Sequence, residues 1–383
     1  MKKKLQDQIA RRLFAHIDAR STDRSGEEMQ ILEREYADPD RARYERERLV
    51  NARPALIGAS SQLAEPGSFV TVNVLGTAIL VARQDDGELR AFRNVCRHRC
   101  ATVVNAESGT GRSFSCGYHG WTYNLDGSLL SIPDGADSFT TVDRTSHGLV
   151  ELPVAERHGL VWAMTTPDAP LDLQRYLGTA IDSDLSELGM ETYALYRAET
   201  FEQPVNWKLV MDGFLEVYHV RYLHPTTVGK ITISNVFVVD VLDEHLRMAS
   251  ARRDIEQLRP VDGVQPTILP GIILTYALMP NTVIVYVRDH VETWTVVPHE
   301  SDPGRCRITL RFLVPELPTT EKARRYWERN WDTVVGAVHD EDWAAARSIQ
   351  GNVVADSKAH MVLGRNELAL HHFHSYVRAA TGD

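Results

Sequence analysis

Two short stretches of the sequence each combine one cysteine with one histidine, Cys96-Arg-His98 and Cys116-Gly-Tyr-His119. Thiolates favour soft metals and iron–sulfur clusters, whereas imidazoles suit zinc, copper and iron. One type of [2Fe–2S] centre binds two thiolates on one iron and two imidazoles on the other. Zinc competes, but zinc sites with two cysteines and two histidines usually take each kind from its own element. The interleaved order therefore favours the cluster over zinc.

Two further histidines, His219 and His224, stand five residues apart near the end of a helix predicted around 206–223, where Pro225 would stop it. A spacing of five does not put two side chains on the same face of a regular helix. The helix must therefore loosen or end between the histidines if both are to bind one metal.

Both stretches resemble one family. CRHR and CGYHGWTY resemble the Rieske signature of aromatic-ring-hydroxylating oxygenase alpha subunits, and the segment from Asn206 to Pro225 resembles the mononuclear-iron motif of the same family. The resemblance runs from about residue 45 to the C-terminus. It implies a Rieske [2Fe–2S] cluster held by four side chains: Cys96, His98, Cys116 and His119. It also implies a facial triad of two histidines and one carboxylate around Fe(II), with positions left open.

The implied iron ligands are His219, His224 and a carboxylate far along the chain. The resemblance points to Asp342 for this third ligand. Asp340 and Glu341 stand in the same acidic run and remain alternatives. The triad also separates two classes of Rieske protein: a Rieske protein without it would be an electron carrier, not an oxygenase.

Glu216 stands three residues before His219, where the family usually carries Asp and a subset acting on quaternary ammonium compounds carries Glu. The resemblance implies that Glu216 accepts hydrogen bonds from His219 and from His119 of a neighbouring subunit, which would orient the ligands and provide an electron path. Gly213 stands where many of the dioxygenases carry Asn. An extra polar contact near the iron is therefore expected to be missing.

The first cysteine loop also departs from the family. Cys100 stands where family members usually carry Gly, and respiratory Rieske proteins join an extra cysteine of each loop in a disulfide. Tyr118 occupies the place of the partner cysteine, so no such disulfide is expected. Gly117 and Gly120 would let backbone amides approach the cluster sulfurs. Trp121 would shield one side of the cluster.

The function implied by the resemblance is that of a terminal oxygenase component. It would take electrons from an NAD(P)H reductase or ferredoxin, activate O₂ and hydroxylate or demethylate a small aromatic or amine substrate. No G-x-G-x-x-G follows a predicted strand, so the nucleotide-binding module is expected on another chain. A cyclic homotrimer is expected, because the family brings cluster and iron together across a head-to-tail contact. An electron-transfer Rieske protein and a zinc-binding structural module are the alternatives.

The surrounding elements predict an α+β protein in which an all-β Rieske domain is inserted into a helix-grip-like α+β catalytic domain. The expected parts are a helical segment at 1–45 that packs on the catalytic domain, the Rieske domain at 46–165 and the catalytic domain at 166–383. In the Rieske part, FVTVNVLGTAILVA, LRAFRNV and GLVWAM read as strands, and QDDGE and NLDGS as turns.

In the last part, runs of β-branched and aromatic residues predict further strands. These lie at 232–241, 245–251, 272–278, 282–288, 291–298 and 306–314. Helices are predicted at 319–350 and 366–379, the second carrying His371-His372-Phe-His374, which we interpret as packing and surface. A pocket wall is predicted from six apolar residues of the sheet. They are Phe237, Val239, Leu269, Ile272, Tyr276 and Met279.

Composition narrows the class of protein. The net charge of −10 over 383 residues argues against nucleic-acid binding, which needs a basic face. Four cysteines are too few for a disulfide scaffold and favour a reducing compartment. The N-terminus has no continuous apolar run, and the most apolar later stretch, 271–279, is too short to cross a membrane. A cytoplasmic protein without a membrane partner is therefore expected.

Overall fold

The computed structural model describes residues 1–355 and 360–382, which form two compact units. The larger unit comprises Met1–Val50, Leu177–Met190 and Leu195–Asp383, and the smaller one comprises Asn51–Tyr176 and Glu191–Ala194. The smaller unit is thus inserted into the chain of the larger one. No helix in the described part of the chain combines the length and apolar character needed to span a bilayer.

The smaller unit is built from three antiparallel sheets. The first has the order β10 (Glu151–Leu152), β5 (Leu89–Arg93), β4 (Thr77–Arg83), β3 (Ser68–Val74) and β6 (Ser108–Thr110). The second has the order β11 (Val154–Arg157), β12 (Leu160–Ala163) and β2 (Ala55–Ala59). The third is β7 (Ser113–Ser115), β8 (Thr122–Asn124) and β9 (Leu129–Ser131). A short helix, α4 (Gly135–Ser138), follows.

The predicted hairpin FVTVNVLGTAILVA forms strands β3 and β4. Its two-residue turn, Leu75-Gly76, has positive φ at both positions, 49° and 78°. This is the conformation whose twist matches that of paired strands. The third sheet is the one that positions chemistry, because the Cys116 loop connects β7 to β8. The Cys96 loop follows β5.

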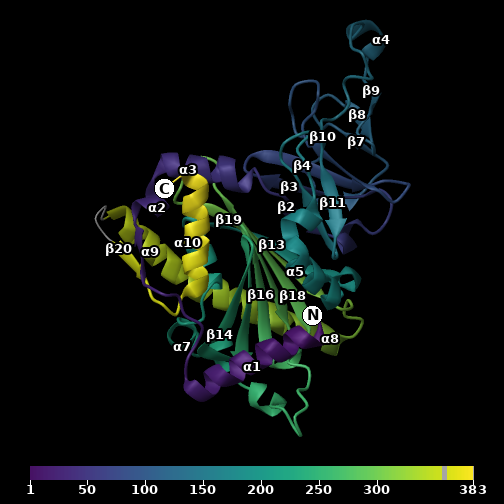
Figure 1. Ribbon diagram of the computed structural model, residues 1–383. Helices are drawn as coiled ribbons and strands as arrows, with labels where there is room; N and C mark the ends of the chain where they lie inside the picture. Colours follow the sequence, from purple (N-terminus) through teal and green to yellow (C-terminus); the bar gives the residue numbers. More distant parts are fainter. Residues whose placement is uncertain (356–359, 383) are drawn as a thin grey trace. The chain divides into compact units, whose positions relative to one another are not determined.

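The core of the larger unit is a seven-stranded antiparallel sheet (Figure 1). Its order is β13 (Ala194–Gln203), β19 (Cys306–Val314), β18 (His290–Pro298), β17 (Thr282–Val287), β16 (Ile272–Leu278), β15 (His245–Arg252) and β14 (Thr232–Leu242). Six of these strands match the predicted runs closely, and β13 was not predicted. Together with the all-β unit, this sheet and its helices confirm the predicted α+β class.

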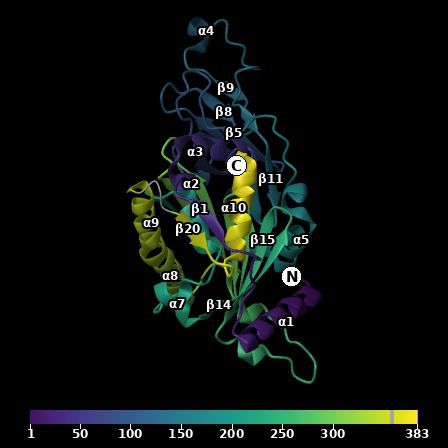
Figure 2. The ribbon, with the colours of Figure 1, turned by 60° about the vertical axis from the view of Figure 1, so that its left-hand side comes forward.

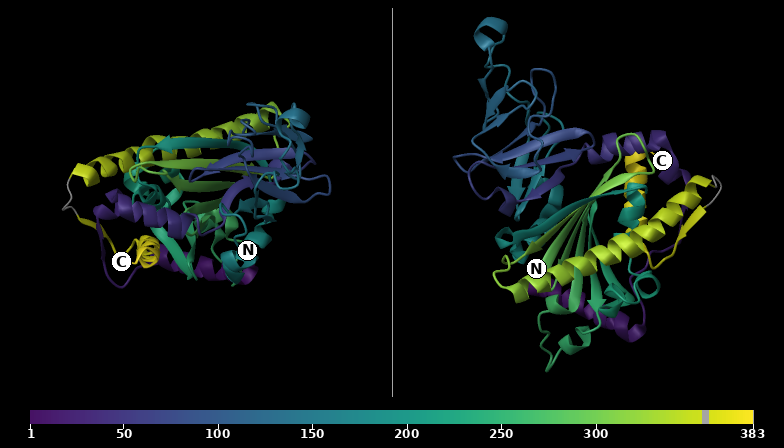
Figure 3. Two further views of the ribbon diagram at one scale, coloured as in Figure 1. Left: turned by 90° about the horizontal axis from the view of Figure 1, so that it is seen from above. Right: turned by 180° about the vertical axis from the view of Figure 1, so that it is seen from behind.

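Helices cover both faces of this sheet. The helix predicted at 319–350 is α8 (Glu321–Val335), a π-helical segment (Gly336–Asp342) and α9 (Trp343–Ala355), which together cross one face (Figure 3). On the other side lie α1 (Lys3–Ala19) and α10 (Leu368–Thr381). The N-terminal helix lies in the predicted helical segment. It is amphipathic and buries one stripe: Gln6, Ile9, Ala10, Leu13 and Phe14.

The remaining elements of the larger unit bind distant parts of the chain together. Strand β1 (Met29–Leu32) pairs antiparallel with β20 (His360–Leu363) beside α9 (Figure 2). The remaining helices are short, apart from α5, which contains one non-helical residue, Gly178. Their bounds are α2 (Arg34–Ala37), α3 (Pro39–Glu45), a π-helical turn (Arg46–Val50), α5 (Leu173–Leu188), α6 (Trp207–Phe214) and α7 (Val220–Leu223).

The C-terminal histidines serve packing, as interpreted from the sequence. His374 is buried, and its Nε2 lies 2.9 Å from Oδ1 of Asp212. The hydroxyl of Tyr36 donates to the other oxygen of Asp212 at 2.8 Å. This network ties α10 and α2 to the end of α6, the helix that leads to the predicted iron histidines.

Candidate metal centres

The two predicted iron histidines flank a single helical turn. The helix predicted over 206–223 is wrong in its middle: α6 ends at Phe214, and α7 begins only at Val220. His219 is the residue before α7, and His224 is the residue after it. A regular helix would have separated the two imidazoles around its axis. This interruption lies before His219, not between the two histidines. The turn between them is helical and ends at His224, whose φ of −113° and ψ of 43° leave the helical region, so the expected end of the helix falls at the second histidine.

Glu216 is the local cause of the interruption. One of its carboxylate oxygens accepts the backbone N–H groups of Tyr218 and His219, the second at 3.1 Å. These groups would otherwise extend α6, so the side chain competes with the helix for its donors. The other carboxylate oxygen contacts Nδ1 of His219. That contact leaves Nε2 of the imidazole facing away from Glu216.

Asp342 completes a group of three possible metal ligands. It is the last residue of the π-helical segment, and such segments inside α-helices often occur at functional sites. Its Oδ1 lies 2.8 Å from Nε2 of His224 and 3.5 Å from Nε2 of His219. The three ligand atoms all lie within 4.8 Å of one another, which suits donors that share one ion at about 2 Å each.

The neighbouring acidic residues occupy different positions. The side chain of Asp340 is 74% exposed, and among the described residues its one ion pair is with the neighbouring His339. Glu341 instead holds His224 from behind: its Oε2 lies 2.6 Å from Nδ1 of that imidazole and accepts the hydroxyl of Thr227 at 2.6 Å. Sequence reasoning considered Glu341 only as a ligand and missed this orienting contact, which leaves Nε2 of His224 directed at Asp342.

The electrostatics of this group follow from its contacts. Burial lowers the pKa of His224, but its hydrogen bonds with Asp342 and Glu341 outweigh burial and raise the pKa above the ordinary value. Burial raises the pKa of Glu341, yet its bonds with His224 and Thr227 outweigh this effect and lower the pKa. Glu341 is therefore a carboxylate at neutral pH. An anionic cradle of this kind favours a cation.

The Asn206-Trp207-Lys208 motif fixes the start of α6. The side chain of Asn206 caps the helix by accepting the N–H of Lys208. Glu45 accepts the indole N–H of Trp207 at 2.8 Å and pairs with the ammonium of Lys208 at 2.6 Å. Lys208 is fully buried, and burial lowers the pKa of its ammonium although Glu45 opposes the shift. This buried pair anchors the helix that carries the site.

In the smaller unit, the two cysteine loops have the same backbone hydrogen bonds. Cys96 accepts the N–H of Cys100 and donates its own to Ala101; Cys116 accepts from Gly120 and donates to Trp121. Cys100 and Gly120 hold the equivalent left-handed position, with φ of 59° and 69°. Glycine adopts this conformation freely, whereas cysteine does so with strain. Cys100 is a free, exposed thiol.

The four predicted cluster ligands differ in burial. Cys96 and Cys116 are 2% and 3% exposed, whereas His98 is half-buried and His119 is exposed. The rings of His98 and His119 lie 4.7 Å apart. Trp121, predicted to shield this region, stacks on His98 with a centroid distance of 5.0 Å and an interplanar angle of 5°. The loops thus bring the imidazoles together at the surface above buried thiols.

Two further contacts tune these ligands. The hydroxyl of Tyr123 lies 3.3 Å from Sγ of Cys96 and accepts the backbone N–H of Arg97 at 2.9 Å. Neither contact was anticipated from the sequence, although Tyr123 belongs to the CGYHGWTY stretch. Burial, with smaller effects of His119 and Arg99, lowers the pKa of His98. The neutral imidazole is the form that binds metals.

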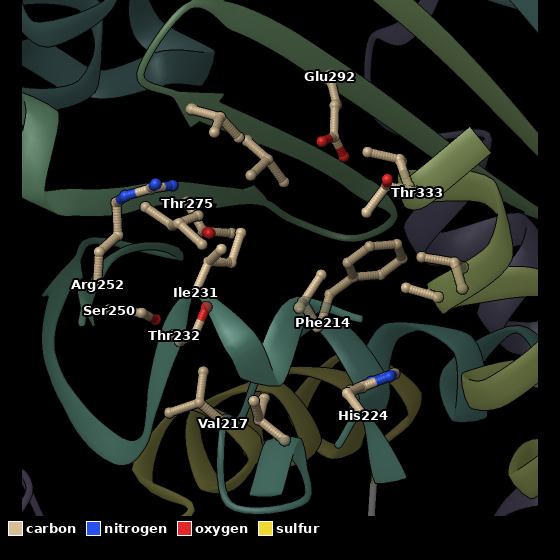
Figure 4. A pocket seen from close by; sticks show the side chains of 18 of the residues that line it. Phe214, Val217, His224, Ile231, Thr232, Ser250, Arg252, Thr275, Glu292 and Thr333 are labelled. Atoms are coloured by element: carbon tan, nitrogen blue, oxygen red, sulfur yellow. The ribbon is translucent and has the colours of Figure 1, made fainter. Parts of the chain in front are cut away.

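A cavity of about 500 Å³ opens beside the His219, His224 and Asp342 group (Figure 4). It lies between the seven-stranded sheet and α8. Phe237 lines it as predicted, but the other five predicted wall residues do not. In β16, for example, the side chains of Ile272 and Tyr276 lie on the opposite face of the sheet from those of Ile273 and Thr275, which line the cavity. The side chains facing the cavity from β15 to β17 are Met248, Ser250, Arg252, Ile273, Thr275, Val285 and Val287.

A second cavity, of about 780 Å³, meets the first at the same group. Glu216, His219 and Asp342 line both cavities, and so does Gly213. A side chain added at Gly213 would meet no other atom within 4 Å. His219 and Asp342 are therefore accessible from two sides, whereas His224 lines the first cavity, and position 213 adds no polar side chain.

Comparison with known proteins gives the same picture of two domains. Residues 190–383 match a family model described as ring hydroxylating alpha subunit (catalytic domain), and residues 53–143 match one described as Rieske [2Fe-2S] domain. The chain is 35% identical over 188 residues to the chlorobenzene dioxygenase subunit alpha of Cupriavidus sp. (strain PS12), covering 48% of this chain and 42% of that protein. It is 34% identical over 186 residues to the biphenyl 2,3-dioxygenase subunit alpha of Rhodococcus jostii (strain RHA1), covering 47% and 40%. The chain thus spans less than half the length of these curated relatives.

Solved structures share the fold. A quaternary ammonium Rieske monooxygenase in complex with an inhibitor superposes with a TM-score of 0.79 at 20% identity, over 92% of this chain and 95% of that one. Naphthalene 1,2-dioxygenase from Rhodococcus sp., bound to indole, superposes with a TM-score of 0.75 at 18% identity, over 99% and 98%.

Proposed function

Because the chain belongs to the family of ring-hydroxylating alpha subunits and contains a Rieske [2Fe–2S] domain, we propose that it is the terminal component of a multicomponent oxygenase. The observation that carries the proposal is the convergence of His219, His224 and Asp342 beside a largely apolar cavity. Two imidazoles and one carboxylate are the ligands of the facial triad of non-haem iron oxygenases. When bound, Fe(II) would supply open coordination positions for O₂.

The chain's own residues would prepare this site. Glu216 and Glu341 each contact Nδ1 of one imidazole, so that both Nε2 atoms are presented to the same point. Partners of this kind fix the tautomer and orientation of a ligating histidine. The apolar wall of the cavity would exclude bulk water from the reacting atoms. The residues we assign to catalysis are Glu216, His219, His224 and Asp342.

We assign the cluster to Cys96, His98, Cys116 and His119. Four donors around one tetrahedral zinc ion would lie within about 4 Å of one another. Among the described residues, the ligand atoms of His219, His224 and Asp342 form a group within 4.8 Å of one another, and the four cluster residues form no such group. Donors spread over two irons need not be so close, which supports a [2Fe–2S] cluster over zinc. A pure electron carrier would leave the triad and its cavity without a role.

Electrons would reach the cluster from an NAD(P)H reductase or ferredoxin on another chain. The exposed imidazole of His119 is the ligand best placed to exchange electrons with another protein. Oε1 of Glu216 contacts one imidazole and retains a second lone pair, which suits the bridge to His119 of a neighbouring subunit in a homotrimer. A cytoplasmic location, where thiols stay reduced, fits these donors.

The substrate class proposed from the family is a small aromatic or amine compound that is hydroxylated or demethylated. Its relatives include dioxygenases named for chlorobenzene and biphenyl, and its structural neighbours include a quaternary ammonium monooxygenase. A cavity of about 500 Å³ lies within the usual range for small-molecule sites.

A turnover assay tests the proposal. Anaerobically reconstituted protein, a surrogate reductase and a panel of aromatic and amine substrates should give substrate-dependent consumption of O₂ and NADH. His219→Ala should keep the brown colour of the cluster and lose turnover. The matched control is His339→Ala, a 43% exposed histidine outside the triad, which should keep turnover. Full turnover in His219→Ala would refute the assignment.

A further inference from the structure

One end of the substrate cavity is polar, and strand alternation creates it. Successive residues of a strand face opposite sides, so Met248, Ser250 and Arg252 of β15 share the face that lines the cavity. On β16, Thr275 stands opposite Met248 in the strand register and faces the same way. Thr232 of β14 stands opposite Arg252. The wall therefore changes from apolar to polar along β15 and ends on a guanidinium.

Arg252 has unused hydrogen-bonding capacity. Its side chain is only 13% exposed, and its Nε donates to Oδ1 of Asp254 at 3.3 Å. Nη1 and Nη2 of Arg252 have no hydrogen-bond partner among residues 1–355 and 360–382. The hydroxyls of Ser250 and Thr275 also have no hydrogen-bond partner in that part of the chain. Figure 4 shows the guanidinium directed into the cavity, on the side where these hydroxyls lie and away from His224.

The charge around Arg252 is not fully balanced. Asp254 is 38% exposed and is shared with Arg288, whose guanidinium lies 3.7 Å away, so two cations face one carboxylate. The acidic groups of another wall already have partners. Glu292 accepts from the indole of Trp294 at 2.8 Å and contacts His290 at 3.2 Å. Arg252 therefore offers free donors to the cavity from a largely buried position, whereas Arg288, which also lines the cavity, has a side chain that is 58% exposed.

From this geometry we infer that the cavity binds a small organic anion whose carboxylate pairs with Arg252, at the end remote from His224. A planar guanidinium matches a carboxylate with two parallel hydrogen bonds, and the hydroxyls of Ser250 and Thr275 can complete its shell. The apolar body of the ligand then extends along the cavity towards the triad. The inference rests on the proposed function for the reaction, but binding of the anion is measurable without turnover.

Two matched pairs of probes test it: benzoate against benzamide, and 3-phenylpropionate against its amide. Their affinities are measured by calorimetry on the anaerobic, metal-loaded protein. At least one acid should bind the wild-type protein about tenfold or more tightly than its amide. Arg252→Gln should weaken that acid by about 10- to 100-fold and leave the amide within threefold, since two charge-assisted bonds are lost and each exceeds a neutral bond by about tenfold or less.

Two variants separate a specific contact from a general field. Arg252→Lys keeps the charge but loses the planar fork, and should weaken the acid by about threefold to tenfold; it also serves if Arg252→Gln is not folded by circular dichroism. Arg288→Gln removes the other cation beside Asp254, which also lines the cavity but is 58% exposed, and should change acid binding less than threefold because solvent screens its charge. Equal binding of acids and amides to the wild-type protein, or an equal loss in Arg288→Gln and the Arg252 variants, would overturn the inference.

The result is distinguishable from failure of the proposed function. A protein that turns over neutral compounds but shows no preference for acids keeps the function and loses the carboxylate site. A protein without turnover that still binds an acid through Arg252 loses the function and keeps the site.

Discussion

Replacing Glu341 by glutamine should weaken Fe(II) binding about tenfold. Oε2 of this residue holds the imidazole of His224 through Nδ1 at 2.6 Å and also accepts the hydroxyl of Thr227 at 2.6 Å. Glutamine keeps the shape and can still accept one neutral hydrogen bond, but the charge is lost. A hydrogen bond to a charged group contributes about 1.5–3 kcal/mol, against about 0.5–1.5 kcal/mol for a neutral one. The difference of about 1–1.5 kcal/mol corresponds to about a tenfold change in affinity.

Asp340→Asn provides the matched control. It removes the same charge one residue earlier, from a side chain that is 74% exposed and faces His339. Competition with a chelator of known affinity, under anaerobic conditions and with the cluster intact, measures both variants. We expect less than a threefold change for the control. If the two variants lost the same affinity, only the overall charge of the acidic run would matter; an unchanged affinity in the Glu341 variant would refute its orienting role.

Other residues allow separate tests. Glu45→Ala should cost about 3–5 kcal/mol of unfolding free energy in urea titrations because it leaves the buried ammonium of Lys208 without its carboxylate. Asp40→Ala, which removes a side chain that is 83% exposed, should cost less than about 1 kcal/mol. Similar costs for the two variants would contradict the anchoring role of Glu45. Burial lowers the pKa of His290, but Asp289 and Glu292 outweigh burial and raise it from 6.5 to about 9. The imidazolium therefore adds about 3 kcal/mol of unfolding free energy below pH 6.5, and this contribution is lost as the pH rises through 9. A His290→Gln variant whose stability had the same pH dependence as the wild type would disprove this. Cys100→Gly should stabilise the smaller unit by up to about 1 kcal/mol in thermal melts, because φ is positive at this position and glycine adopts it freely. Gly120→Ala should destabilise the unit, because φ is also positive there and the added Cβ would approach Pro133 to 3.1 Å. Stability changes of the opposite signs would be inconsistent with left-handed strain.

The strands were predictable where β-branched residues dominate, but their facing was not. β16 has the predicted bounds, yet the prediction placed Ile272 and Tyr276 on the cavity wall, where the structure has Ile273 and Thr275. A sheet with both faces covered carries apolar residues on each, so its sequence does not alternate and gives no phase. β13 was missed because its side chains are mostly exposed or half-buried and it stands at the edge of the sheet, next to β19.

The site was predictable in its residue types and not in its local geometry. Three acidic residues stand together at 340–342, and only the π-helical register decides that Asp342 meets the histidines while Glu341 lies behind one of them. The break after α6 depends on Glu216 capturing two backbone N–H groups, a competition that helical propensity does not describe. The spacing of His219 and His224 predicted a helix end between them, and α7 does end at His224, but the break between α6 and His219 was not predicted.

The most direct test of two metal centres in this chain is the content of iron and acid-labile sulfide per chain after anaerobic reconstitution. The account predicts three irons and two sulfides in the wild-type protein, and two irons with two sulfides in Asp342→Asn. Iron loss accompanied by sulfide loss in that variant, or zinc in place of iron at Cys96, His98, Cys116 and His119, would contradict it.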